Sequence, residues 1–375
     1  MLTIFLGKLL LKYNIYDLKQ KWGSALDFDF CDGKTDIIVF GNGAGWFNSL
    51  FENIKDEPYF HIGSNYFSPF QNGKIFNCIN RMIFGNRFGN KERTDYIARL
   101  LINNMCKKIG DLFPNRAIFI INRTNYLAHN TYFLETLKSM NKNFVLVYWF
   151  TDIVAALEID VPSIITICRK YYDHVITYEK KDAIKYNFNY IETPYSIYPI
   201  RRGEKTDIDL LYIGKAKLDI DPTRYKKLIA IFEAAKKKKL NTYFSIVDVP
   251  YELQKYPDDI VYNKNIPYSE VLSKISRCKC ILEVSQKGEN GTTLRMFEAI
   301  AYNKKLLFTN SEMTEHQYYD DRIMKLLEED SNGEYDIDIE FINRNEEKNE
   351  TLISLLSPYR FVSAVEDVVR GARNE

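Results

Sequence analysis

Histidine, tryptophan and surplus charge are scarce in this 375-residue chain. With only four histidines, a histidine-rich metal enzyme is a poor fit. The 51 lysines and arginines balance 50 aspartates and glutamates, which argues against a nucleic-acid binder because such proteins carry a basic excess. The longest purely apolar run, residues 144–150, is far too short to cross a bilayer. Apolar residues make up 46% of the chain, so we expect a globular protein with a sizeable core.

Cysteine is also sparse, and its scatter argues against a disulfide framework. Cys278 and Cys280 form a single close pair with no second pair to complete a zinc site. We therefore predict free, mostly buried thiols in a reducing cytoplasm. The apolar N-terminus, with Lys8 and Lys12, lacks the features of a secretory signal. It is interpreted either as a first strand or helix of the fold or as a segment that binds peripherally to the inner face of a membrane.

Short apolar runs alternate with helical patterns along the chain, as is typical of parallel strands buried on both faces. Predicted strands cover residues 36–40, 117–121, 143–150, 174–178, 209–213, 242–247, 280–284 and 305–308. Predicted helices cover residues 46–54, 93–110, 125–140, 180–186, 223–239, 268–277 and 292–302. We predict an α/β fold of two Rossmann-like, doubly wound domains that face each other across a cleft.

A polar stretch, residues 199–206, is interpreted as a linker between the two domains. The predicted domains are residues 1–198 and residues 207–345. Residues 357–375 are predicted as a C-terminal helix. One interpretation is that this helix packs against the first domain. In such folds the default ligand site lies outside the carboxyl ends of the strands.

One segment, residues 281–300, combines a strand, a glycine-containing loop and a helix start. The exposed N–H groups and dipole of a helix start attract anions, and arginine can hold a phosphate with two parallel bonds. A carboxylate one turn further on can accept from ribose hydroxyls. We therefore predict a diphosphate-ribose site, the alternative being a helix that is merely capped. The candidate residues are Gly291, Thr292, Thr293, Arg295 and Glu298.

Two further segments are candidates for the same ligand. Gly214 and Lys215 follow a predicted strand, where glycine admits a ligand to the backbone and lysine supplies charge. Ile266 and Tyr268 stand before a predicted helix, in a loop that could hold and stack a nucleobase. For both segments a purely structural role is an equal alternative.

A glycine-rich loop, residues 41–45, follows the first predicted strand. It does not complete a dinucleotide fingerprint, because Trp46 stands where the third glycine belongs. We interpret Gly43, Gly45 and Trp46 as part of a loop that opens onto the cleft on the acceptor side. No bound cofactor is expected.

Two residues are candidates for a general base toward an acceptor hydroxyl. Asp152 stands directly after a predicted strand, and His129 lies in the predicted helix 125–140. The alternatives are a helix-capping aspartate and a packed surface histidine. Asp-x-Asp triplets, which can hold Mg²⁺ on a diphosphate, occur four times and are therefore a weak signal, so we predict no metal site.

The segment Gly291-Thr-Thr-Leu-Arg-Met-Phe-Glu-Ala299 is followed by Lys304-Lys-Leu-Leu-Phe-Thr-Asn310. With these motifs the chain resembles the two-domain GT-B glycosyltransferases of bacterial lipopolysaccharide and capsular polysaccharide synthesis. The likeness runs from about residue 115 to 312. It implies a nucleotide-sugar donor in the second domain and a glycan or lipid-linked glycan acceptor in the first.

The chain departs from the family pattern at three places. Glu289 and Glu298 are separated by eight residues, where the retaining pattern has seven. Phe150-Thr151-Asp152 replaces a Trp-Asp-Ser sequence, and Asn122-Arg123-Thr124 replaces an Arg-Gly-Glu-like turn. The stereochemical outcome and the identity of the base stay open.

The resemblance predicts a metal-independent glycosyltransferase, with a hexosyl group and a UDP-sugar favoured, that extends a bacterial surface glycan. The alternatives are a nucleotide-sugar epimerase and a non-catalytic glycan-assembly partner. The chain is rich in aromatic residues, with 27 tyrosines and 24 phenylalanines. Clusters that include Trp46-Phe47, Tyr59-Phe60, Tyr66-Phe67 and Phe70 are interpreted as stacking surfaces for the acceptor.

Overall fold

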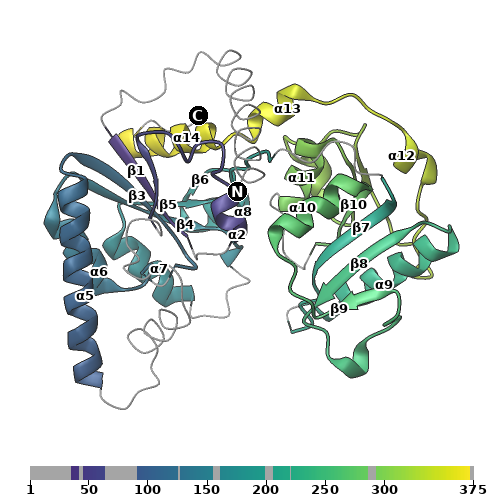
Figure 1. The fold of residues 1–375 in the computed structure, drawn as a ribbon, viewed down its shortest axis with the longest axis horizontal. Helices are drawn as coiled ribbons and strands as arrows, with labels where there is room; N and C mark the ends of the chain where they lie inside the picture. Colours follow the sequence, from purple (N-terminus) through teal and green to yellow (C-terminus); the bar gives the residue numbers. More distant parts are fainter. Residues whose placement is uncertain are drawn as a thin grey trace, which may run out of the picture. The chain divides into compact units, whose positions relative to one another are not determined.

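The computed structural model describes residues 35–41, 45–63, 91–125, 127–154, 161–198, 206–219, 221–285 and 293–371. The chain divides into two compact units. We call residues 24–194 with 358–375 the first unit, and residues 195–357 the second unit. Each unit is built on one sheet of parallel strands (Figure 1).

The sheet of the first unit has the strand order β2-β1-β3-β4-β5-β6. The strands are β1 (Thr35–Phe40), β2 (Phe60–Ile62), β3 (Arg116–Asn122), β4 (Phe144–Phe150), β5 (His174–Thr177) and β6 (Asn189–Tyr190). The helices are α2 (Gly45–Ser49), α5 (Lys91–Leu112), α6 (Thr131–Met140), α7 (Val161–Tyr171), α8 (Lys180–Tyr186) and α14 (Pro358–Arg370). The strand order reverses between β1 and β3, which is where open parallel sheets bind ligands.

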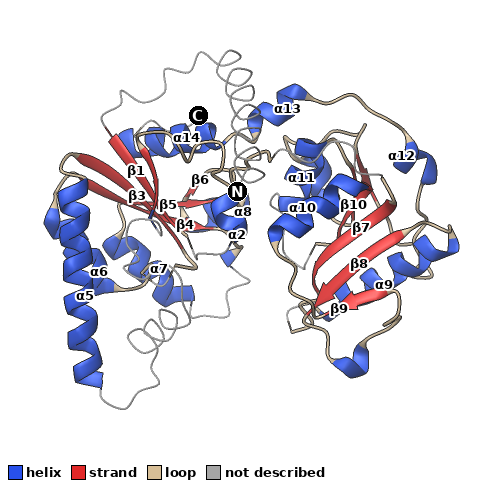
Figure 2. Ribbon diagram, viewed as in Figure 1, coloured by secondary structure: helices blue, strands red, loops and turns tan. Residues whose placement is uncertain are grey.

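Helices cover both faces of this sheet, and the side chains of its central strands explain why (Figure 2). The seven residues of β4 are buried except for a partly buried Val145, so both faces need apolar cover. Apolar side chains of α5, α6 and α7 pack on one face. On the other face, Trp149 of β4 contacts Phe51 and Phe361, which brings the C-terminal helix α14 into the first unit.

The sheet of the second unit has the strand order β12-β11-β10-β7-β8-β9. The strands are β7 (Ile208–Lys215), β8 (Thr242–Val247), β9 (Ile260–Tyr262), β10 (Cys278–Glu283), β11 (Lys305–Phe308) and β12 (Met324–Leu326). The helices are α9 (Pro222–Lys237), α10 (Tyr268–Arg277), α11 (Leu294–Tyr302), α12 (Ile339–Asn343) and α13 (Glu350–Leu355), with 3-10 turns at Tyr251–Leu253 and Ser311–Glu315. Read from β9, the strands follow the order third, second, first, fourth, fifth, sixth, which is the Rossmann order with its switch point between β7 and β10.

The predicted fold class is therefore confirmed: two doubly wound parallel sheets with helices on their faces. Some element boundaries were predicted wrongly. The helix predicted at residues 125–140 begins only at Thr131, and the one predicted at 46–54 is a single turn, α2, followed by turns. Within the described residues, the cysteines are free and buried, and no helix is long and apolar enough to span a bilayer.

Candidate functional site

The carboxyl end of β7 lies at the switch point of the second unit. A Cβ at Gly214 would come within 2.7 Å of the Tyr212 hydroxyl, which donates to the Lys215 carbonyl at 3.2 Å. Glycine is therefore required here by the packing of a neighbouring side chain. β10 ends at the same edge, because Cys280 lies opposite Leu210 in a parallel register.

Arg295, on the first turn of α11, reaches back to this edge. It donates to the Ile213 carbonyl at 2.6 Å and forms an ion pair with the carboxylate of Glu298. These bonds use two of the five donors of its guanidinium. Burial alone would lower the pKa of Arg295, but the charges of Glu298 and Glu283 outweigh it and hold that pKa above its usual range. The side chain as a whole is 20% exposed, and three of its five N–H donors are not used by these two bonds.

Glu298 is completely buried and belongs to a chain of hydrogen bonds. The Tyr268 hydroxyl donates to its carboxylate at 3.1 Å and lies 3.0 Å from the Tyr195 hydroxyl. Burial and the charge of Glu298 raise the pKa of Tyr268 well above its ordinary value, so this phenol keeps its proton. In the structure, the two residues predicted to bind a ribose and a nucleobase bond to each other.

Two other polar groups lie at the same edge. Lys215 is exposed and pairs with Asp248, the first residue after β8, at 3.0 Å. The hydroxyl of Ser285, two residues beyond β10, is shielded from solvent and has no hydrogen-bond partner in the described part of the chain. A buried hydroxyl without a partner is unusual in a folded protein. The sequence analysis did not single out Ser285 or Asp248.

The start of α11 is capped by a side chain, as expected from the alternative in which the helix start has only a structural role. The Thr293 hydroxyl accepts from the Met296 N–H at 3.4 Å. Ile266 is half-buried in the loop between β9 and α10, at the carboxyl edge. Gly291 and Thr292 lie outside the described residues.

A second cluster lies at the carboxyl edge of the first unit and is centred on Arg123. Arg123 follows β3, and its guanidinium donates to the Asp152 carboxylate at 2.9 Å. The neighbouring Asn122 donates to the Thr151 hydroxyl at 3.0 Å. Asp152 is 45% exposed, so its carboxylate remains accessible while Arg123 orients it. The sequence analysis noted Arg123 as a departure from the family pattern but gave it no role.

His129 belongs to the same cluster. It lies in the turn before α6, not in a helix as predicted, and its Nε2 is 2.7 Å from the Tyr148 hydroxyl. Burial lowers the pKa of His129, and the charge of Arg123 lowers it further. The imidazole is therefore neutral at pH 7, and its Nδ1 is the nitrogen that remains for a ligand.

The predicted acceptor surface is only partly described. Gly45 begins α2, Trp46 is half-buried, and Gly43 lies outside the described residues, as do Tyr66, Phe67 and Phe70. The stacking hypothesis is wrong for Phe47 and Phe60, which are 0% and 2% exposed. Both side chains belong to the core, where their rings contact the buried Phe51.

No protein-family model matches the chain, and no curated protein matches it in sequence. Among solved structures it is similar to alpha,alpha-trehalose 6-phosphate synthase from Burkholderia multivorans, with 10% identity and a TM-score of 0.49 over 91% of this chain and 100% of that one. It is also similar to TarM, with 13% identity and a TM-score of 0.43 over 73% of this chain. The matched part spans 54% of the length of TarM.

Proposed function

We propose that this protein is a glycosyltransferase that moves a sugar, a hexose being favoured, from a nucleotide-sugar to a bacterial surface glycan. The observation that carries the proposal is the polar edge at the switch point of the second unit. There, Arg295 is anchored to β7, Lys215 extends into solvent, and the Ser285 hydroxyl has no partner among the residues that the structure describes. Rossmann-like sheets bind nucleotides at this position.

The chemistry follows from these groups. Cleavage of the donor develops negative charge on the departing diphosphate, and preorganised cations and N–H donors stabilise that charge. Lys215 can exchange Asp248 for a phosphate oxygen, and Arg295 adds a positive charge that is anchored to the end of β7. The N–H groups at the start of α11 supply further donors. In this mechanism a UDP-sugar is the favoured donor, its base lies against Ile266 and the first residue of α10, Tyr268, and no metal takes part.

The acceptor side of the proposal lies in the first unit. Asp152 carries an accessible carboxylate that Arg123 orients, and it serves as the base that removes a proton from the acceptor hydroxyl. His129, neutral at pH 7, is the second candidate for that role. The variants in the Discussion separate the two.

The surface of α8 favours an acceptor that is linked to a lipid. Ile184 is 84% exposed, whereas the single acid of the helix, Asp182, is buried and accepts from the Val154 N–H at 2.7 Å. Exposed lysines with an exposed apolar residue suit the surface of an anionic membrane. α8 follows the carboxyl end of β5, the same edge that carries Asp152. The exposed lysines of α8 are Lys180, Lys181 and Lys185.

The test is incubation of the protein with UDP-, GDP-, CMP- and dTDP-sugars, with binding measured by calorimetry and slow donor hydrolysis by release of the nucleotide. We expect binding and hydrolysis for one nucleotide class, unchanged by EDTA. Binding without hydrolysis or transfer would point to a non-catalytic glycan-assembly partner. A failure of every donor to bind would refute the proposal, and inhibition by EDTA would refute metal independence.

A further inference from the structure

The second unit has a cavity of about 300 Å³ at the amino edge of its sheet, the edge opposite the switch point. Its walls include Lys279 near the start of β10, Lys304 and Lys305 at the start of β11, and Arg344 just after α12. Glu346 is the one carboxylate among the lining residues. Four cations therefore line this cavity, and two carboxylates oppose them: Glu346 among the lining residues, and Asp209, which lies 2.8 Å from the Lys279 ammonium.

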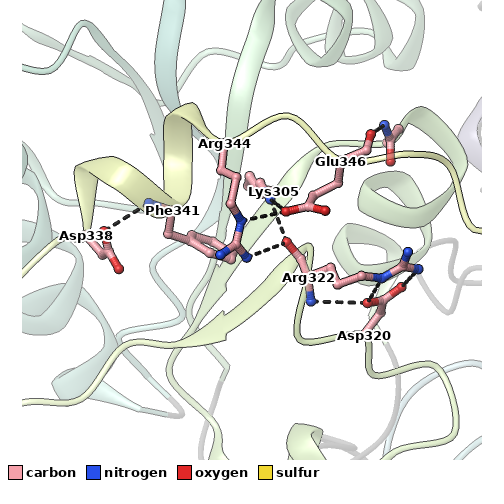
Figure 3. A network of polar contacts seen from close by, with 8 residues as sticks. Lys305, Asp320, Arg322, Asp338, Phe341, Arg344 and Glu346 are labelled. Atoms are coloured by element: carbon pink, nitrogen blue, oxygen red, sulfur yellow. Dashed lines mark hydrogen bonds and ion pairs between the residues drawn. The ribbon is translucent and has the colours of Figure 1, made fainter.

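Residues 343–346, at and after the end of α12, line the cavity, and Figure 3 shows Arg344 and Glu346 beside Lys305. Arg344 donates to Glu346 at 2.5 Å, and Lys305 reaches the same carboxylate at 3.4 Å while donating to the Arg322 carbonyl at 2.5 Å. The Lys305 ammonium also lies 4.8 Å from the centre of the Phe341 ring. Glu346 is thus shared by two cations.

Lys304 bonds only to neutral groups in this structure. It donates to the carbonyls of Ser276 at 3.0 Å and Cys278 at 2.8 Å, which leaves one of its three N–H donors for another group. Burial lowers the pKa of both Lys304 and Lys305. An anion in the cavity would offset that desolvation, because an opposite charge nearby favours the charged form.

We propose that this cavity is a binding site for a small phosphate-bearing molecule, with the phosphate held by Lys279, Lys304 and Arg344. With Glu346 and Asp209 counted against the four cations, two positive charges remain, and a phosphate monoester carries between one and two negative charges at pH 7. Asn343, Asn345 and the Thr206 hydroxyl also line the cavity and can bond to hydroxyl groups on the remainder of the ligand.

This site is separate from the proposed donor site. β7 and β10 run from the cavity edge to the switch point, so the two sites lie at opposite ends of the same strands. Arg295 and Lys215 take no part in lining the cavity. The proposal can therefore fail while the proposed glycosyl transfer holds, and the reverse is also true.

The probe is inorganic phosphate, compared with chloride at matched ionic strength. The first measurement is the rate of lysine acetylation, followed by mass spectrometry of the intact protein's peptides. We expect phosphate to slow acetylation of Lys279 and Lys304 by roughly threefold or more at saturation. Lys237, which is exposed on α9 and pairs with Glu334, is the internal reference and should not change. Equal rates in phosphate and chloride would overturn the proposal.

The second measurement is phosphate affinity by calorimetry in four variants. Arg344 is 57% exposed, so Arg344→Gln should fold and should weaken binding by about tenfold, while Arg344→Lys retains most of the affinity. Lys237→Gln, which removes the same charge elsewhere, should leave the affinity unchanged. If Arg344→Gln and Lys237→Gln behave alike, or if Lys215→Gln removes the binding, the phosphate is held elsewhere and the proposal is wrong.

Discussion

Arg295 and Glu298, one turn apart on α11, form an ion pair in which the Glu298 side chain is completely buried and the Arg295 side chain is 20% exposed. The same arginine bonds to the Ile213 carbonyl, so the pair joins the start of α11 to the end of β7. Tyr268 adds a hydrogen bond from α10. Three elements of the second unit therefore meet on one charged pair beneath the switch point.

This ion pair should contribute to the stability of the folded protein, independently of any role in ligand binding. Arg295→Met leaves a buried, unpaired carboxylate, and we expect it to lower the free energy of unfolding by about 3 kcal/mol. Adding Glu298→Gln removes that charge and should recover at least about 1 kcal/mol. Urea denaturation of the single and double variants measures both values. If the loss of stability in the double variant equals the sum of the losses in the two single variants, the two residues are not coupled.

Lys215 should bind the donor through its charge. Lys215→Gln is expected to weaken nucleotide-sugar affinity about tenfold, because a charge-assisted bond to phosphate is lost. Asp248→Asn releases the lysine from its ion pair and should strengthen binding. Lys226→Gln, at an exposed position of α9, is the matched control. Calorimetry with the preferred donor is the measurement, and equal affinities in all three variants would remove Lys215 from the site.

Asp152 and His129 can be distinguished by kinetics. If Asp152 is the base, Asp152→Asn should lower kcat by about a hundredfold or more with little change in stability, because its side chain is 45% exposed. Asp111→Asn, an exposed residue at the end of α5, controls for loss of charge. A full kcat in Asp152→Asn, with a large loss in His129→Gln, would assign the role to the histidine instead.

The lowered pKa of His129 predicts how stability depends on pH. The unfolded chain takes up the proton at a higher pH than the folded protein does, so stability is fully present above the unfolded value, near 6.5, and declines as the pH falls below it. We expect Tm to fall between pH 7 and pH 5, and to fall less in His129→Gln. Comparison of the two proteins at pH 8 isolates the part that does not depend on pH. Parallel curves would contradict the prediction.

The α8 surface predicts binding to anionic membranes. The protein should sediment with vesicles that contain phosphatidylglycerol and not with vesicles of phosphatidylcholine alone, and salt should weaken the binding. Ile184→Ser should reduce binding severalfold, since an exposed apolar side chain is lost. The exposed Leu253→Ser on the second unit is the control. Unchanged binding in Ile184→Ser would exclude α8 as the contact surface.

Where sequence prediction erred, competing local signals explain the error. α7 was not predicted, because its sequence is rich in β-branched residues and contains Pro162, which a helix tolerates in its first turn. The helix predicted from Asn125 begins later, because Asn130 is the residue that caps it and accepts from the Phe133 N–H at 2.9 Å. Both asparagines are suitable caps, so the sequence did not distinguish them.

The amino-acid sequence alone predicted the longer buried strands and the helices that alternate with them. It indicated two parallel sheets, because continuous apolar strands need cover on both faces. It also predicted Thr293, Arg295 and Glu298 as candidate diphosphate-ribose ligands from their spacing around a helix start. Only the tertiary structure decided what these side chains contact: Arg295 bonds to Ile213, 82 residues away, and Arg123 bonds to Asp152, 29 residues away. Such partners depend on the order in which strands pair across the sheet, and local sequence patterns do not specify that order.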